Sequence, residues 1–212
     1  MRKSQDCLKK GPLYACIKCI LTPIFKVLYR YDISGKENIP KDTGFILTCN
    51  HLSLIDVVFL VISQKKKVCF MAKSELFKNK IFAKILYTLG AFPVNRGKGD
   101  MSAINKAEQI LKDGGILGIF LEGTRSKDGE LLKPKSGISM IAFKTKSKIL
   151  PACITPRNGG KIKLFKKTFL SYGNVVTPQE IGLISGNSYE FRNASRNVMS
   201  IIRQLREKDL ER

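Results

Sequence analysis

Short apolar runs alternate with longer segments of helical periodicity through most of this 212-residue chain. Predicted strands lie at 43–49, 67–72, 91–95, 115–121 and 149–155. Predicted helices lie between them at 54–63, 79–89, 100–113 and 138–147. This alternation predicts a single α/β domain with a mostly parallel or mixed sheet flanked by helices.

The remaining segments of the domain have weaker patterns. Residues 31–42 are rich in turn-forming residues and predict an irregular connection. Residues 161–176 are rich in lysine and predict one or two further strands. Residues 188–210 predict a final amphipathic helix, whose apolar face would contain Phe191, Val198, Ile201, Ile202 and Leu205.

The first 32 residues differ from the rest of the chain. Residues 1–11 are polar and basic, and residues 12–29 are mostly apolar but interrupted by Lys18, Pro23 and Lys26. A membrane-spanning helix needs roughly 20 largely uncharged residues. We therefore predict a basic amphipathic helix, bent at Pro23, that lies in the membrane interface. The alternative is a helix packed on the domain's own core. The predicted division is a membrane-docking segment at 1–32 and a domain at 33–212.

The charge of the chain restricts its partners. A net charge of +21 predicts an anionic partner. An aromatic content of 8% without tryptophan offers few stacking platforms for bases, so an anionic membrane surface is favoured and no nucleic acid is expected. Cys16 and Cys19 have the spacing of a metal-binding pair, but no second pair completes a site. We expect no metal and no cofactor.

Charged side chains follow three predicted strands, at the ends where ligands bind in open α/β sheets. They are Lys73, Arg96 and the run Glu122-Gly123-Thr124-Arg125. Arginine suits bidentate recognition of phosphate, lysine adds a point charge, and a glycine lets backbone amides approach an anion. The pattern predicts an anion site at this edge of the sheet. For the run at 122–125, the alternative is a local ion pair that closes a loop.

His51, the only histidine, follows the first strand of the domain and precedes Asp56 by five positions. A carboxylate so placed can hold the imidazole in one tautomer, which leaves the other ring nitrogen free to take a proton from a hydroxyl. The alternative is that His51 is a turn residue and that Asp56 caps a helix.

Four segments together resemble the motifs of the 1-acyl-glycerol-3-phosphate acyltransferases, the PlsC-like glycerolipid acyltransferase family. Residues 50–56 resemble the first motif, N-H-x-S-x-x-D, and residues 92–96 are similar to the second. Residues 120–126 resemble the third, F-P-E-G-T-R-S, with Leu121 where the family usually has proline. Residues 150–154 resemble the fourth, an apolar run around a proline. Order and spacing agree as well.

The resemblance implies a role for each matching residue. His51 would be the general base and Asp56 would orient it. The acceptor-binding region would contain Arg96, Glu122, Gly123, Thr124 and Arg125. Lys73 matches a lysine that in some relatives helps to bind the acceptor's phosphate.

The implied reaction transfers an acyl chain from acyl-CoA or acyl carrier protein to lysophosphatidic acid (1-acyl-glycerol-3-phosphate), giving phosphatidic acid. The enzyme would be peripheral or monotopic, at the cytoplasmic face of the membrane. Two alternatives stay open: an acyltransferase for another lysophospholipid or glycerol-3-phosphate, and a non-catalytic protein that binds anionic membranes.

Overall fold

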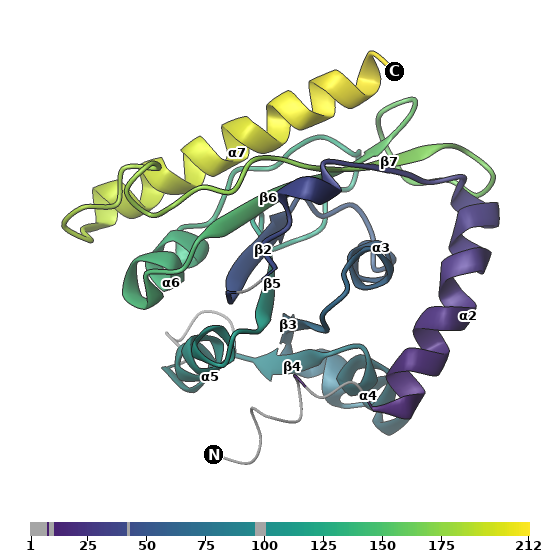
Figure 1. The fold of residues 1–212 in the computed structure, drawn as a ribbon, viewed down its shortest axis with the longest axis horizontal. Helices are drawn as coiled ribbons and strands as arrows, with labels where there is room; N and C mark the ends of the chain where they lie inside the picture. The colour runs from purple at the N-terminus through teal and green to yellow at the C-terminus, as the bar shows by residue number, and fades with distance from the viewer. Residues whose placement is uncertain (1–7, 9–10, 42, 96–100) are drawn as a thin grey trace.

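The computed structural model describes residues 8, 11–41, 43–95 and 101–212. The described residues form a seven-stranded sheet in the order β1-β7-β6-β2-β5-β3-β4, which runs through the centre of the molecule (Figure 1). The strands are β1 (Asp32–Ser34), β2 (Phe45–Cys49), β3 (Val68–Lys73), β4 (Ala91–Val94), β5 (Ile116–Phe120), β6 (Ile149–Pro156) and β7 (Thr168–Tyr172).

The sheet is mixed, which confirms the predicted fold class. β2 pairs in parallel with β5 and β6, and β3 pairs in parallel with β4 and β5. β7 runs antiparallel to β6, and β1 is parallel to β7. The carboxyl ends of β2, β3, β4, β5 and β6 therefore meet at one edge of the sheet. We call this edge the site edge.

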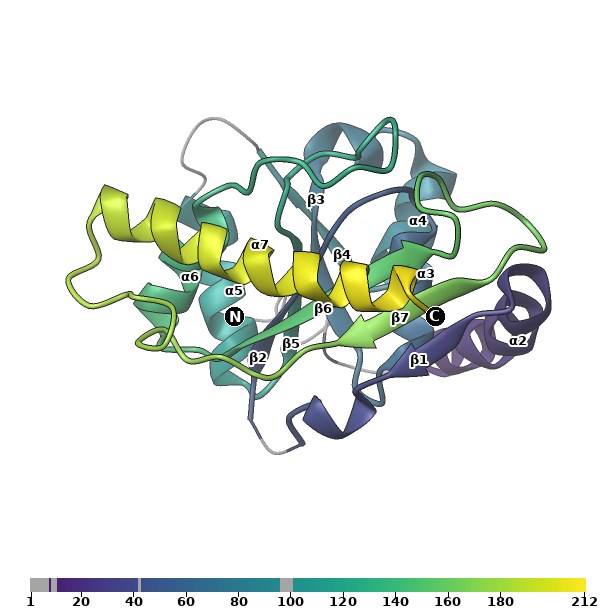
Figure 2. The same cartoon turned by 90° about the horizontal axis from the view of Figure 1, so that it is seen from above.

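Helices cover both faces of the sheet (Figures 1 and 2). The helices are α2 (Pro12–Tyr29), α3 (Asp56–Ser63), α4 (Lys80–Thr88), α5 (Met101–Lys112), α6 (Gly137–Thr145) and α7 (Ser188–Leu210), with short 3-10 helices η1 (Lys36–Asn38) and η2 (Ser74–Phe77). Buried side chains of α5, α6 and α7 form one core cluster with the sheet, and those of α2 and α3 form the other. All five residues of β2 are buried because both faces are covered.

One expected segment needs correction. The predicted irregular connection at 31–42 contains β1, which extends the sheet beyond β7. A strand of three residues is too short to carry a recognisable alternation of polar and apolar positions. In the lysine-rich segment 161–176, one strand forms, β7.

The helix α2 packs one face on the domain. Tyr14, Phe25 and Tyr29 are buried, and the rings of Phe25 and Tyr29 contact Phe59 of α3 at centroid distances of 5.2 and 5.4 Å. The opposite face exposes an apolar stripe, formed by Leu13, Ile20, Ile24 and Val27. One face of α2 therefore packs on the core of the domain, as in the alternative to membrane docking. The prediction that this segment docks on a membrane now applies to the exposed face only.

By length and mean hydropathy, 1.4, α2 is also the one candidate membrane span among the described helices. It continues unbroken through Pro23. Its inner face belongs to the core of the domain, so the helix lies along the domain (Figure 1).

Candidate active site

The loop between β2 and α3 carries His51 and is fixed to the neighbouring strand by Asn50. The buried Asn50 side chain donates from Nδ2 to the carbonyl of Ile154 at 3.0 Å and accepts from its N–H at 2.8 Å. Both contacts are with β6, which pairs with β2. The Asn50 side chain therefore replaces the backbone hydrogen bonds that a further residue of β2 would make with β6. It fixes the start of the loop that carries His51.

His51 and Asp56 form a dyad. Nδ1 of His51 lies 2.8 Å from Oδ2 of Asp56, which also accepts from the N–H groups of Leu52 at 2.6 Å and Ser53 at 2.8 Å. Asp56 is fully buried, whereas the His51 side chain is 14% exposed. Because Oδ2 is an acceptor, Nδ1 carries the hydrogen and Nε2 is the basic nitrogen. His51 also lines a pocket at the site edge.

The imidazole is also held on its flat side. The ring of Phe120 stacks on it with a centroid distance of 3.8 Å and an angle of 11°. Phe120 ends β5 and pairs with Cys49, two residues before the histidine. The backbone of His51 is tied as well, since its carbonyl accepts from Ser126 N–H at 2.8 Å. Ring, ring nitrogen and backbone are thus each fixed by a different contact.

Several predicted site residues meet around one pocket of about 270 Å³ at the site edge. His51, Lys73, Thr124 and Arg125 line it together with apolar side chains from β3, β5, η2 and α4. Lys73 also forms an ion pair with Glu75 at 3.0 Å. Arg96, which the sequence predicted for the same region, lies outside the described residues.

A second pocket of about 550 Å³ lies beside the first. The two share Met71 and Phe120, and the second is lined mainly by apolar side chains of β5, α5 and α6. Gly123 lines this second pocket, at the turn after β5. Its φ of +69° lies in the left-handed region that favours glycine, which lets the chain reverse between Glu122 and Thr124.

Glu122 does not line either pocket. Its side chain is 1% exposed, and neither carboxylate oxygen has a hydrogen-bond partner among the described residues. Burial is the main cause that raises the pKa of Glu122 to about 7, and the charge of Asp56 raises it further. The N–H groups of Leu132 and His51 oppose this rise, although neither has the geometry of a hydrogen bond. Glu122 is therefore buried close to the backbone of His51, in the loop between β2 and α3, which we call the histidine loop.

The departure from the third motif at Leu121 has a structural counterpart. Leu121 is buried, and its N–H donates to the carbonyl of Cys49 at 3.1 Å. Proline has no N–H and cannot make this bond. In this chain, the ladder between β2 and β5 therefore continues one residue beyond Phe120.

Two supporting residues, Asn50 and Phe120, had no predicted role. Both belong to segments that the motifs singled out, but only the pairing of β2 with β5 and β6 brings them to the histidine. The available sequence signal was their position, since each lies within one residue of a predicted strand end.

Known proteins resemble this chain. A family model described as Acyltransferase matches residues 30–155. The 1-acyl-sn-glycerol-3-phosphate acyltransferase of Bacillus subtilis (strain 168) is 38% identical over 136 residues, which are 64% of this chain and 67% of that protein. The protein of the same name from Borreliella burgdorferi is 30% identical over 196 residues, 91% of this chain and 76% of the relative.

A solved structure resembles it too. The crystal structure of the 1-acyl-sn-glycerophosphate (LPA) acyltransferase PlsC from Thermotoga maritima has a TM-score of 0.65 and 30% sequence identity, and the match covers 84% of this chain and 71% of that one. The family resemblance that the four motifs predicted is confirmed: this chain belongs to the acyltransferase family.

Proposed function

We propose that this protein transfers an acyl chain from a thioester to the free hydroxyl of 1-acyl-glycerol-3-phosphate, giving phosphatidic acid. Its family membership and the names of its relatives support this reaction class and this acceptor. The observation that carries the chemistry is the dyad, in which Nδ1 of His51 lies 2.8 Å from Asp56 while the same side chain lines a pocket.

In the proposed mechanism, Nε2 of His51 takes the hydroxyl proton as the oxygen attacks the thioester carbon. A hydroxyl has a pKa far above neutrality, so its proton must leave as the new bond forms. The carboxylate of Asp56 stabilises the imidazolium that results. When the tetrahedral intermediate collapses, the C–S bond breaks and the imidazolium returns the proton to the leaving thiolate. The products are an ester and a free thiol, and no covalent enzyme intermediate is required.

The acceptor's phosphate would bind at the polar end of the pocket. Arg125 and Lys73 supply positive charge there, and Thr124 supplies a hydroxyl donor. Arg96 is proposed to add a third positive charge. The apolar remainder of the pocket suits the hydrocarbon part of a lipid.

Glu122 and Gly123 are proposed to act through the loop rather than by direct contact. The buried Glu122 supports the histidine loop, and the left-handed turn at Gly123 directs Thr124 and Arg125 toward the pocket. Both residues are thus positioning residues within the acceptor-binding region.

The protein is proposed to work on an anionic membrane, at its cytoplasmic face, as a peripheral or monotopic enzyme. The apolar stripe of α2 would enter the interface while lysines contact lipid phosphates. Residues 1–32 would dock the domain of residues 33–212 at the surface that contains its acceptor.

The test is an acyl-transfer assay with the purified full chain. Vesicle-borne lysophosphatidate is supplied with acyl-CoA in one arm and acyl carrier protein in the other. We expect one free thiol per phosphatidic acid, measured by thiol release and by mass spectrometry of the lipids. Glycerol-3-phosphate and uncharged-headgroup lysolipids serve as competing acceptors. If the enzyme prefers one of these competitors, that compound and not lysophosphatidate is its acceptor. If neither donor releases a thiol, the proposed reaction is refuted.

A further inference from the structure

The loop between β6 and β7, residues 157–167, combines positive charge with an exposed apolar tip. It contains five basic residues and no acidic one: Arg157, Lys161, Lys163, Lys166 and Lys167. At its tip, Leu164 is 55% exposed and Phe165 is 63% exposed. Lys163 and Lys166 flank them and are exposed too. We call residues 163–166 the loop tip.

The backbone holds Phe165 in this exposed position. Its φ of +59° lies in the left-handed region, which an L-residue with a bulky side chain rarely adopts. Its N–H donates to the carbonyl of Leu28 in α2, and Lys166 N–H donates to Lys163 carbonyl within the tip. An unfavourable backbone conformation that leaves most of an aromatic residue exposed gains little packing energy for the folded domain. Such strain often marks a functional site.

The loop tip lies at the site edge. β6 is parallel to β2, so the loop leaves the sheet at the same edge as His51. Gly160 in this loop packs against Gly129 in the loop that follows Arg125, because a Cβ on Gly129 would lie 2.2 Å from the Gly160 backbone. The bond to Leu28 places the tip beside the carboxyl-terminal end of α2, where the apolar stripe ends at Val27 (Figures 1 and 2).

We propose that the loop tip is a second membrane-contacting element, which inserts Leu164 and Phe165 into the interface of an anionic phospholipid bilayer. The aromatic ring suits the boundary between headgroups and acyl chains, and the flanking lysines suit lipid phosphates. Five positive charges without a negative one complement an anionic surface. With the stripe of α2 beside it, the tip turns the site edge, and with it the pocket of His51, toward the bilayer.

The inference deepens the proposed function and rests on it in one respect, that the substrate is a bilayer lipid. Vesicle binding is measured without turnover, so the membrane-contact inference and the proposed reaction can be refuted separately. Absence of acyl transfer refutes the proposed reaction and leaves the vesicle result standing.

The absence of tryptophan from the chain permits a direct test. Phe165→Trp introduces a single tryptophan at the tip, whose emission can be excited separately from that of the tyrosines. Tyr189→Trp is the matched control, because Tyr189 is 67% exposed and lies in the first turn of α7. The segment before α7 is placed at the opposite edge of the sheet by the Ile149–Val176 bridge. Each variant is mixed with phosphatidylglycerol vesicles whose acyl chains are brominated at different depths.

We expect the emission of the Phe165→Trp protein to shift to the blue and to be quenched at least twofold by shallow bromines. The control protein should show neither change. If the vesicles sediment the Phe165→Trp protein without altering its emission, the loop tip does not insert and the inference is overturned.

Two further substitutions separate membrane contact from folding. Phe165→Glu should weaken binding to anionic vesicles at least tenfold, whereas Tyr189→Glu should not. Turnover of a water-soluble short-chain acceptor should be unchanged in both variants.

Phe165→Gly should also weaken vesicle binding but raise the melting temperature, since glycine adopts the left-handed conformation freely. Unchanged vesicle binding in both Phe165 variants refutes the proposal. So does a wild-type dimer that Phe165→Glu dissociates, because a second copy would then cover the tip.

Discussion

A single oxygen of Asp56 organises the histidine. Oδ2 accepts the Nδ1 hydrogen of His51 and two backbone N–H groups, whereas Oδ1 is buried without a partner among the described residues. Since the two backbone bonds fix the carboxylate, the carboxylate in turn fixes the imidazole. The arrangement favours one tautomer, with the basic nitrogen at Nε2.

Substitution of the dyad tests this assignment. We expect His51→Ala to abolish acyl transfer, because the chain has no other imidazole. Asp56→Asn should lower kcat on the order of 10²–10⁴-fold, since control of the tautomer is lost. Thiol release gives kcat, and circular dichroism checks the fold. The mechanism is wrong if His51→Ala keeps half of the wild-type turnover.

The two cations of the pocket define a second prediction. Arg125→Ala and Lys73→Ala should each lower kcat/KM for lysophosphatidate by roughly 10–100-fold, since a hydrogen bond to a charged group contributes about 1.5–3 kcal/mol. Lys127→Ala is the control, because Lys127 is exposed nearby and does not line the pocket. The comparison is with an uncharged lyso-acceptor. Equal losses for both acceptors would contradict a phosphate role.

Glu122 predicts a pH dependence of stability. Its carboxyl has a pKa of about 7 in the folded protein, against an ordinary value of 4.5. Between these values the folded protein keeps a proton that the unfolded chain has lost, so the free energy of unfolding falls as the pH rises from 4.5 to about 7. Glu122→Gln removes this dependence. In the wild type, the fall in the free energy of unfolding between these pH values is on the order of 3 kcal/mol, at about 1.4 kcal/mol per pKa unit.

Denaturant unfolding at several pH values measures this effect. Glu207→Gln, an exposed substitution on α7, is the control and should follow the wild-type pH dependence. If the Glu122→Gln protein follows that dependence as well, the carboxyl of Glu122 is ionised at neutral pH and is stabilised by partners other than those described.

Strands and helices near the site were predictable to different degrees. β2, β5 and α3 lie within two residues of their predicted bounds, because long buried apolar runs between turn residues leave little ambiguity. The convergence of His51, Lys73 and Arg125 on one pocket followed from the rule that ligands bind at the carboxyl ends of strands. Local patterns were sufficient for these features.

Other features depend on contacts that no local pattern encodes. Asn50 bonds to Ile154, 104 residues away, and Phe120 reaches the imidazole only through the pairing of β5 with β2. Glu122 was grouped with the acceptor-binding residues by its motif, but it is buried, and its carboxyl lies near the backbone of His51 and of Leu132, ten residues further on. Tertiary packing determined these details.

The Asn50 contact to β6 gives a prediction about the loop between β2 and α3. Asn50→Ala should lower the free energy of unfolding by about 2 kcal/mol, because it leaves the N–H and C=O of Ile154 buried without their partner. It should also lower kcat, since the loop that carries His51 loses its anchor. Asn158→Ala, at an exposed position, is the control for unfolding. Unchanged stability of the Asn50→Ala protein would show that the anchor is dispensable.

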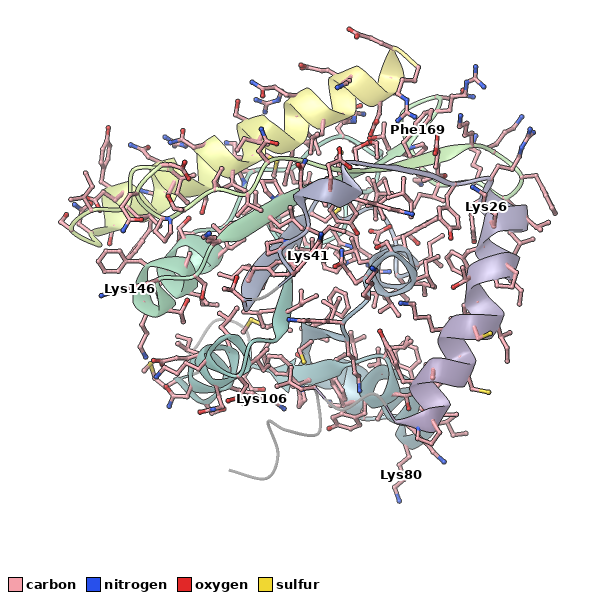
Figure 3. All side chains as sticks on the ribbon, in the orientation of Figure 1. Lys26, Lys41, Lys80, Lys106, Lys146 and Phe169 are labelled. Carbon is pink, nitrogen blue, oxygen red and sulfur yellow. The ribbon has the colours of Figure 1, made fainter. Side chains whose placement is uncertain are left out.

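Basic side chains lie on widely separated parts of the described surface. Lys26, Lys80 and Lys146 extend from widely separated parts of the molecule (Figure 3). With a net charge of +21, the protein is attracted to an anionic bilayer from many directions. In the proposed function, charge alone would bring the protein to the membrane surface but would not orient it. Orientation requires an apolar surface at a defined place, and the outer stripe of α2 provides one.

Two neighbouring positions on α2 separate orientation from folding. Val27 is 67% exposed in the outer stripe, whereas Phe25 is 7% exposed in the core. Val27→Asp should weaken binding to anionic vesicles and lower turnover of vesicle-borne lysophosphatidate several-fold, with stability and turnover of a water-soluble acceptor unchanged. Phe25→Ala should lower the free energy of unfolding by about 3–5 kcal/mol instead.

Vesicle co-sedimentation, at low salt and at high salt, measures membrane binding, and denaturant unfolding measures stability. High salt screens the charge attraction and weakens vesicle binding of both proteins. The ratio of Val27→Asp binding to wild-type binding should nevertheless stay as low at high salt as at low salt. If Val27→Asp binds vesicles as the wild type does, the stripe of α2 does not dock the protein, and its only role is to pack the domain.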